Sequence, residues 1–335
     1  MTGTSTVRLR AMATDVTLSV AGDGRDVTLA LDRAGQVFRR VEAACTRFDP
    51  AGPLAAVNAA PQRWHAVPPE LFDAVGEAWQ AHRETEGLFD PRVLETLLRL
   101  GYDRTLPFRR GPVTIGTAAV DGRDGAFRPE QVPVRNAVRP AAPGPWHPEL
   151  DPQRRAVRLG EHPIDLGGIG KGLAVRWAAR ELAGTGAPYL VEAGGDCCLG
   201  GDGPDGDGWR VGVEDPDQAG ERPDLLAVLE LRTTSCATSS IRVRNWQVDG
   251  RPVHHLIDPR TADSARSGLR SVTVVDPDPA RAEVWSKALF LTGRDGIAQA
   301  CAGRGLAALW VDDDGRLGTS EPVRPLLIWE VERVG

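Results

Sequence analysis

A turn of four glycines leads directly into a helical pattern at residues 164–184, and this segment constrains the fold more than any other. Glycine reaches backbone angles closed to other residues and lets a ligand or a second backbone approach the main chain. The apolar residues that follow recur at helical spacing, which predicts an amphipathic helix. Such a helix start presents N–H groups and the positive end of the helix dipole, both suited to a phosphate. Lys171 adds a positive charge at the same place.

The same segment also fits a tight turn whose only role is to pack a helix on a sheet. Its spacing is not that of a P-loop, because G-x-x-x-x-G-K-[ST] is missing, and it does not read G-x-G-x-x-G after a strand. On this segment alone, an anion-binding turn and a packing turn both stay open.

The composition is that of a globular protein that can bury a sizeable core. The 335 residues are 41% hydrophobic and 26% charged, which is ordinary for a folded domain. The net charge is −6 with both signs interspersed, so we expect no nucleic-acid partner. No stretch approaches the roughly 18 apolar residues of a membrane-spanning helix, so we expect no membrane association.

The cysteines and the first residues of the sequence point to the cytoplasm. Five cysteines are an odd number and form no C-x-x-C pair, which favours reduced, buried thiols over a disulfide framework. The first residues lack the apolar core of a signal peptide. We therefore expect a cytoplasmic protein.

Helical and strand patterns follow one another irregularly along the chain. Apolar periodicity predicts helices at residues 26–48, 69–87, 93–100 and 280–291. Short segments rich in β-branched residues predict strands at 189–192, 209–213, 225–231, 235–239, 253–257, 271–275, 307–311 and 326–331, after an alternating stretch at 7–20. Residues 107–148 are rich in proline, glycine and arginine and are expected to form loops. Since the strands do not follow a regular βαβ order, we expect an α+β fold of mixed sheets and flanking helices, in one large domain over residues 1–335.

Five further segments lie around the DLGG-x-x-KG turn in a familiar order. They are MATDVTL at Met12, GLFDPRV at Gly87, VEAGGDCCLGG at Val191, HHLIDPRTADSA at His254 and AEVWSKALFLTG at Ala282. Together they resemble the ApbE family of flavin transferases from about residue 12 to about residue 293. The resemblance implies an enzyme that moves FMN from FAD onto a threonine or serine of an acceptor protein and releases AMP. FAD and an acceptor protein are then the expected partners.

The resemblance implies that His255, in the H-x-IDPRT element, is the base that deprotonates the acceptor hydroxyl. Imidazole titrates near neutral pH, which suits that role. A core histidine bonded to a backbone group is the alternative interpretation. The neighbouring His254 is expected to be structural.

Seven other positions match residues that contact the flavin nucleotide in the family: Met12, Leu88, Phe89, Asp90, Asp165, Lys171 and Ile257. By resemblance, Lys171 contacts a phosphate and Asp165 hydrogen-bonds the ligand. A turn or capping residue is the alternative for the two aspartates, and strand core is the alternative for Ile257. The hydroxyls of Thr238 and Ser239 can also line the site.

The metal positions depart from the family. The resemblance implies Mg²⁺ held by a backbone carbonyl at about Gly168 and by Asp and Thr side chains four residues apart on one helix face. This chain carries Glu283 and Lys287 at those positions. Glutamate remains a possible oxygen ligand, whereas a protonated lysine cannot bind Mg²⁺. The lysine either pairs with Glu283 on an ordinary helix surface or places its ammonium where the metal would sit.

Two functions stay open. One is FAD:protein FMN transferase, and the other is an FAD-binding protein with a lost or altered metal site that acts as a flavin binder or FAD pyrophosphatase. Further positions where the chain differs from the usual family residue are Gly52, Pro53, Arg92, Glu192, Ser240 and Ala262.

Overall fold

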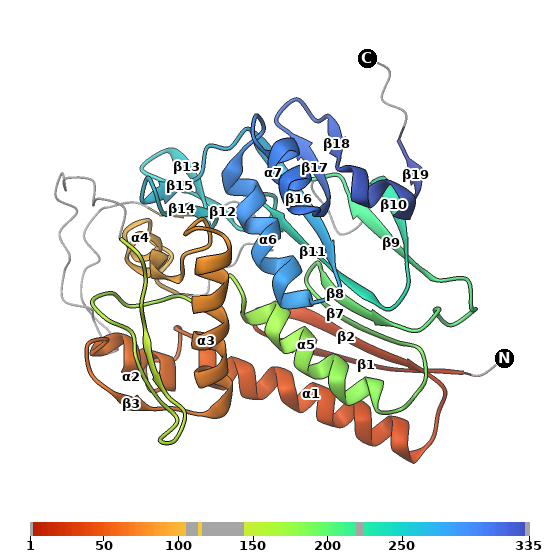
Figure 1. The fold of residues 1–335 in the computed structure, drawn as a ribbon, viewed down its shortest axis with the longest axis horizontal. Helices are drawn as coiled ribbons and strands as arrows, with labels where there is room; N and C mark the ends of the chain where they lie inside the picture. The colour runs from red at the N-terminus through yellow and green to blue at the C-terminus, as the bar shows by residue number, and fades with distance from the viewer. Residues whose placement is uncertain (1–2, 105–112, 116–143, 219–223, 332–335) are drawn as a thin grey trace.

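The central element of the molecule is an eight-stranded sheet (Figure 1). The computed structural model describes residues 3–104, 113–115, 144–218 and 224–331. In spatial order the strands are β1 (Thr4–Ala11), β2 (Thr14–Ala21), β7 (Tyr189–Ala193), β8 (Asp196–Gly200), β11 (Thr234–Ser240), β16 (Leu269–Asp276), β17 (Ala307–Asp312) and β18 (Leu317–Thr319). Every neighbouring pair is antiparallel. The N-terminal hairpin is therefore joined edge to edge with strands from the second half of the chain.

Helices cover one face of this sheet (Figure 1). They include α1 (Arg25–Cys45), α5 (Gly170–Ala183), α6 (Pro279–Thr292) and α7 (Ile297–Arg304), while α3 (Pro69–Glu84) packs against α1. Helix α1 packs beside α5 and on β1 and β2, while α6 packs on β11 and β16. None of the helices in the described ranges is both long and apolar enough to cross a membrane.

Side-chain periodicity explains how helix and sheet meet. Val16, Leu18 and Val20 alternate along β2 and are all at most 1% exposed. Helix α1 buries one stripe against them, at the helical spacing of Leu31, Ala34, Phe38 and Val41. The two patterns, with periods of two and of about 3.6 residues, form one apolar core.

Smaller sheets complete the fold. One is β19 (Leu327–Glu330), β10 (Leu225–Leu231) and β9 (Trp209–Glu214), which covers the other face of the large sheet. The others are β13 (Arg251–His254) with β12 (Asn245–Val248) and β4 (Thr114–Ile115), β14 (Ile257–Asp258) with β15 (Asp263–Ser264), and β3 (His65–Ala66) with β6 (Ala156–Arg158) and β5 (Glu149–Asp151). Among the strand pairs of the described residues, β12 and β4 run in parallel, and an isolated parallel bridge joins Thr4 to Gly22. The expected α+β fold with mixed sheets is confirmed.

Most predicted elements are present within a few residues of the expected limits. Helices α1, α3 and α6 match predictions, and the predicted helix at 93–100 is α4 (Leu94–Arg99), preceded by a 3-10 turn η1 (Pro91–Val93). Three helical segments were not predicted: α2 (Pro53–Ala59), α7 and the 3-10 helix η3 (Glu321–Leu326). Most of the predicted loop region at 107–148 lies outside the described residues. The extent of the domain stays a prediction.

All five cysteines are buried and none forms a disulfide. Cys197 on β8 and Cys236 on β11 are register partners, with their sulfur atoms 3.2 Å apart. Burial raises the pKa of the Cys198 thiol to about 12, and that of Cys45 likewise to about 12. The thiols of Cys45 and Cys198 are therefore held in the protonated form.

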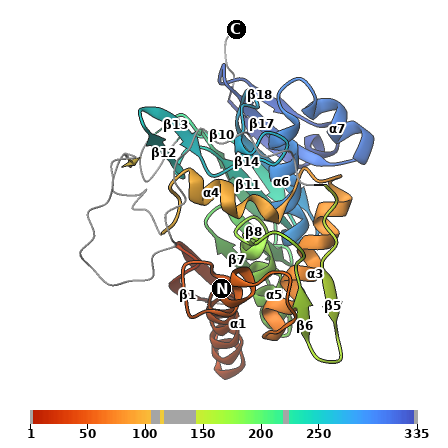
Figure 2. The same cartoon turned by 90° about the vertical axis from the view of Figure 1, so that its left-hand side faces the viewer.

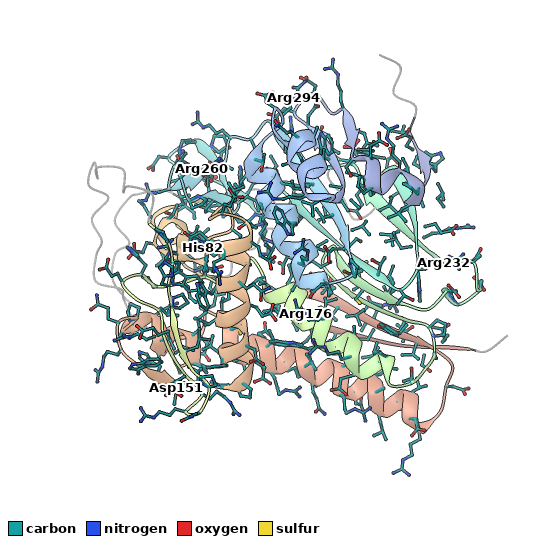
Figure 3. All side chains as sticks on the ribbon, viewed as in Figure 1. His82, Asp151, Arg176, Arg232, Arg260 and Arg294 are labelled. Atoms are coloured by element: carbon teal, nitrogen blue, oxygen red, sulfur yellow. The ribbon has the colours of Figure 1, made fainter. Side chains whose placement is uncertain are left out.

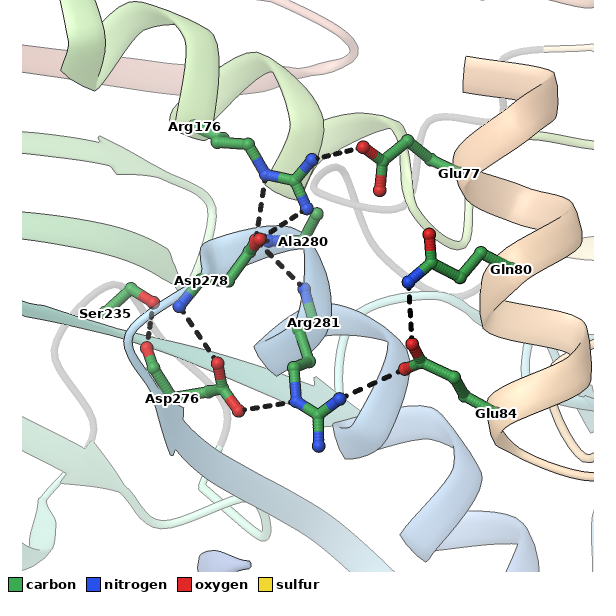
Figure 4. Close-up of polar contacts among 9 residues, drawn as sticks. All are labelled: Glu77, Gln80, Glu84, Arg176, Ser235, Asp276, Asp278, Ala280 and Arg281. Carbon is green, nitrogen blue, oxygen red and sulfur yellow. Dashed lines mark hydrogen bonds and ion pairs between the residues drawn. The ribbon is translucent and has the colours of Figure 1, made fainter. Parts of the chain in front are cut away.

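Helices α5 and α6 cross in close contact at Gly172. A Cβ atom added to Gly172 would lie 2.6 Å from the Pro279 carbonyl oxygen and 2.6 Å from the Ala280 Cα. Beside the crossing, Arg176 of α5 bonds Asp278, the residue that caps α6, and also reaches Glu77 of α3 (Figure 4). The crossing therefore requires a residue without a side chain.

Replacing Gly172 by alanine should destabilise the fold because the new methyl group meets backbone atoms that cannot move aside. We expect a loss of about 2–3 kcal/mol in the free energy of unfolding, measured by denaturant titration. Gly303 on α7 is the control, since a Cβ there meets nothing within 4 Å. Gly303→Ala should be neutral or stabilising by up to about 1 kcal/mol. Equal stabilities of the two variants would contradict the crossing.

Candidate active site

A cavity of about 530 Å³ opens where the β1–β2 turn, the end of α1, the start of α5 and the side of α6 meet. Helix α4 contributes to its wall and lies between the β12–β13 hairpin and α3 (Figure 2). Ten of the positions singled out in the sequence line it: Met12, Leu88, Phe89, Asp90, Asp165, Gly168, Lys171, His255, Ile257 and Lys287. The eleventh, Glu283, lies directly behind Lys287, with Oε1 of Glu283 3.1 Å from Nζ of Lys287.

Met12 stands in the turn between β1 and β2. Met12 and Ala13 have positive φ angles of 53° and 58°, as in the tight turns that favour asparagine and glycine. The Met12 N–H donates to Oε1 of Glu42 on α1 at 2.7 Å, which holds the turn. A Cβ atom on Gly170 would lie 3.4 Å from the Met12 methyl carbon, so the thioether lies over the start of α5.

The segment at 88–90 is held by His82 at the end of α3 (Figure 3). Nδ1 of His82 lies 3.1 Å from the Phe89 carbonyl oxygen, and Nε2 accepts from the Trp146 N–H at 3.3 Å. Burial lowers the pKa of His82, so the ring is neutral and donates from Nδ1. Phe89 in turn packs on the glycine turn, since a Cβ on Gly168 would lie 2.9 Å from its ring.

The same local motif, Asp-Pro-Arg, occurs twice near the cavity: at Asp90, which lines it, and at Asp258, which follows the lining residue Ile257. Oδ1 of Asp90 accepts from both the backbone N–H and Nε of Arg92, and Oδ2 accepts from Nη2. Asp258 and Arg260 repeat these three bonds. Asp90 is thus a turn residue, which is the alternative that the sequence left open. Arg92, a departure from the family, gains a structural role as its partner.

Asp165 pairs with Arg47, which follows the end of α1. The Nε–Oδ2 distance is 2.5 Å, and the Arg47 side chain is only 6% exposed. Oδ1 of Asp165 accepts from the Gly167 N–H, so the aspartate also shapes the glycine turn. The guanidinium lies 4.2 Å from the ring centre of Phe48 and 4.8 Å from that of Tyr102. Its Nη2 is buried without a hydrogen-bond partner among the described residues, so it remains available to a ligand.

Replacing Asp165 by asparagine should leave the Arg47 charge buried and uncompensated. We expect a loss of about 3 kcal/mol in the free energy of unfolding, because the buried guanidinium would lose the carboxylate that offsets its desolvation. Glu321→Gln is the control, since Glu321 is 86% exposed and pairs with Arg324 at the surface. It should change stability by less than about 0.5 kcal/mol. Denaturant titrations giving similar losses for both variants would reject the buried pair.

Two lysines and two carboxylates form the floor of the cavity, and we call them the lysine–carboxylate cluster: Lys171, Asp196, Glu283 and Lys287. The ammonium of Lys171 bonds Oδ2 of Asp196 and lies 3.5 Å from Oε1 of Glu283. Oε2 of Glu283 accepts from the Gly172 N–H at 2.7 Å. We expected the N–H groups of this glycine turn to be free for a phosphate, but the Gly172 N–H donates to a side chain of α6.

Burial and the opposite charges act against each other on the pKa values of the cluster, and the outcome differs from residue to residue. Burial disfavours the Lys171 ammonium, but Asp196 and Glu283 outweigh this effect and raise its pKa. Burial likewise disfavours the Glu283 carboxylate, but Lys287 and Lys171 lower its pKa overall. Burial lowers the pKa of Lys287 and is only partly offset by Glu283. For Asp196 burial prevails over Lys171, and the pKa rises to about 6.

His255 is half-buried on the cavity wall beyond β13. Its Nδ1 lies 3.2 Å from the Arg244 carbonyl oxygen. A proton on Nδ1 satisfies that carbonyl and leaves Nε2 able to accept a proton. Burial and the positive charges of Arg244 and Lys287 lower the pKa of His255 well below 6.5, so the ring is neutral at neutral pH. His254 instead contacts the Ala265 carbonyl oxygen through Nε2 and packs edge-on against Phe290.

Arg244 is a cavity residue that the sequence interpretation missed. It lines the cavity beside His255. No motif or periodicity in the sequence marks it as a site residue, since it lies in a short loop with other arginines nearby. Within the part of the chain that the structure describes, its guanidinium has no carboxylate at ion-pair distance. It therefore offers a positive charge to an anionic ligand.

Three further candidates from the sequence are Ile257, Thr238 and Ser239. Ile257 lines the cavity and is also 5% exposed in a small core with Trp246, so its core role is observed and its contact with a flavin nucleotide stays a prediction. Thr238 bonds Thr273 of β16, and Ser239 bonds Ser286 of α6. Neither hydroxyl is among the residues that line the cavity.

These features define a mixed α+β protein with a charged cavity where the β1–β2 turn meets the ends of α1 and α5 and the side of α6. The chain belongs to the ApbE family, whose family model matches residues 12–310. The resemblance seen in the sequence is thereby confirmed.

Individual relatives agree with this membership. The FAD:protein FMN transferase of Escherichia coli strain K12 is 30% identical over 155 residues, which is 45% of this chain and 43% of that protein. The chain thus spans less than half the length of that relative. The solved ApbE protein of Thermotoga maritima is similar over 97% of this chain and 99% of its own, with a TM-score of 0.78 and 25% identity. The flavin transferase ApbE of Vibrio cholerae has the same fold, with a TM-score of 0.76 and 23% identity over 97% and 99% of the two chains.

Proposed function

We propose that this protein is an FAD:protein FMN transferase, which joins the FMN part of FAD to a threonine or serine hydroxyl of an acceptor protein. The observation that carries the proposal is the state of His255: a neutral ring on the cavity wall, with Nδ1 satisfied by a backbone carbonyl and Nε2 able to take a proton. Membership of the ApbE family supports it.

The reaction that fits this site is a displacement at phosphorus. The acceptor hydroxyl oxygen attacks the phosphorus of the FMN part, and its proton moves to Nε2 of His255. The bond from that phosphorus to the oxygen bridging to AMP breaks, and AMP leaves with the electron pair. Such transfers depend on position and on compensation of phosphate charge more than on covalent chemistry.

The two sides of the cavity suit the two parts of FAD. Apolar side chains of Met12, Leu88 and Ile257 would contact the flavin ring. The ammonium groups of Lys171 and Lys287 and the guanidinium of Arg244 would face the phosphates. Five buried thiols without a disulfide favour a reducing, cytoplasmic setting for the reaction.

Replacing His255 by glutamine should abolish transfer while FAD still binds, because a base acts on the reacting proton and adds little to ground-state binding. We expect a loss of at least about a hundredfold in the rate of AMP release, with an FAD affinity within about threefold of wild type. AMP release is followed by chromatography and FAD binding by quenching of flavin fluorescence. Transfer at the wild-type rate would remove His255 from the role of base.

The pH dependence gives a second check on His255. Since its pKa lies well below 6.5, the wild-type rate should stay level as the pH falls from 8 to 6.5 and decline only below that range. A base with an unshifted pKa would already be half inactive at about pH 6.5.

AMP release without flavin on the denatured acceptor would indicate hydrolysis by water instead of transfer.

Replacing Arg244 by glutamine should weaken FAD binding, since the variant loses a cavity charge that no carboxylate of the described residues compensates. We expect a loss of about 1–3 kcal/mol in binding free energy, or roughly five- to 150-fold in Kd, measured by fluorescence titration. Arg232→Gln is the matched control, because Arg232 is half exposed, pairs with Asp202 and lies away from the cavity (Figure 3). An unchanged affinity in the Arg244 variant would place the phosphates elsewhere.

A further inference from the structure

The residues of this chain do not fit the divalent cation that the ApbE family implies. Mg²⁺ takes about six oxygen ligands at about 2.0–2.1 Å. Of the two carboxylate oxygens of Glu283, Oε1 faces the ammonium groups of Lys287 at 3.1 Å and Lys171 at 3.5 Å, and Oε2 accepts the Gly172 N–H at 2.7 Å. Both oxygens are thus already bonded.

Lys287 also fills the space between two of the expected ligand positions. Its Cδ and Cε atoms lie 3.6 Å from the point where a Cβ of Gly168 would stand. Its Nζ reaches Oε1 of Glu283 and lies 3.4 Å from the Glu283 carbonyl oxygen. The lysine side chain therefore runs from the glycine turn to the carboxylate and fills the space between these two expected ligand positions.

The charges of the lysine–carboxylate cluster already balance. Its two ammonium groups face two carboxylates, and all four side chains are at most 16% exposed. A divalent cation would stand a few ångströms from both ammonium groups, and like charges so close together in a buried site repel strongly.

One oxygen of the cluster stays free: Oδ1 of Asp196 is buried without a hydrogen-bond partner among the described residues. A single oxygen does not make a magnesium site. Elsewhere in the described ranges, too, no group of three or more histidine, cysteine, aspartate or glutamate side chains is arranged to hold a metal ion.

We infer that the Lys287 ammonium replaces the divalent cation in this chain, so that the cavity binds FAD without a metal. This inference rests on the proposed function for the identity of the ligand. The ammonium donates hydrogen bonds to phosphate oxygens but carries one positive charge where the metal carries two. Compensation of phosphate charge then depends more strongly on Arg244, a cavity cation with no carboxylate at ion-pair distance among the described residues.

The test compares wild type with a double variant, Glu283→Asp with Lys287→Thr, which restores the family residues. Binding of Mn²⁺, a paramagnetic stand-in for Mg²⁺, is measured by electron paramagnetic resonance without any flavin. FAD affinity is measured by fluorescence titration in EDTA and again in excess Mg²⁺. We expect wild type to bind no Mn²⁺ and to hold FAD equally in both buffers. The double variant should bind one Mn²⁺ and hold FAD at least about tenfold more tightly with Mg²⁺ than with EDTA.

Lys287→Met is the control, since it removes the charge, keeps most of the side-chain stem and adds no oxygen ligand. It should bind no Mn²⁺ and should lose FAD affinity in both buffers alike. Circular dichroism establishes that each variant is folded, and if the double variant is not, the single variant Lys287→Thr takes its place.

Stoichiometric Mn²⁺ binding by wild type, or an FAD affinity that falls in EDTA, would overturn the inference. A folded double variant that binds no Mn²⁺ would also overturn it, because Lys287 would then not be what excludes the metal. The absence of FAD binding in every variant would reject the proposed function instead, and the Mn²⁺ measurements would still decide the question of the metal.

Discussion

One buried carboxylate, that of Glu283, joins the packing of the helices to the chemistry of the cavity. Its side chain is 1% exposed, comes from α6, and accepts the Gly172 N–H near the start of α5. Burying a carboxylate costs several kcal/mol unless partners compensate for the lost water. Here two ammonium groups and the positive end of a helix do so. Because α5 and α6 cross at the same place, the spacing of the helices also sets the spacing of the charges.

The elements predicted well are those whose pattern is long. Helix α1 repeats its apolar stripe over 21 residues, and β10 covers the predicted limits 225–231. Helices α2 and α7, with seven and eight residues, contain too few apolar positions to define a period. The alternating stretch at 7–20 is in fact two strands, because Met12 and Ala13 form a turn without the glycine or asparagine that would have marked it.

The cavity residues could be predicted as members of motifs, but their partners could not. Asp165 and Arg47 are 118 residues apart in the sequence, and Glu283 and Gly172 are 111 residues apart. Such pairs depend on how the helices pack, which no local pattern encodes. Lys171, for example, follows a glycine turn as a phosphate-binding lysine would, yet its ammonium bonds Asp196 on β8. Arg92 shows that a departure from a motif can have a local structural reason, since its guanidinium donates a hydrogen bond to the Asp90 carboxylate.

The cysteines have a practical consequence for work on this protein. A thiol reacts as the thiolate, and burial keeps the protonated form in place at Cys45, Cys198 and Cys301, whose pKa values rise to about 12, 12 and 11. Cys236 is held in the same form, because its bond with Cys197 and its burial raise its pKa. A cysteine introduced on the exposed surface would thus be labelled by maleimide far ahead of the native thiols. A reporter dye could be attached beside the cavity without first removing any of the five.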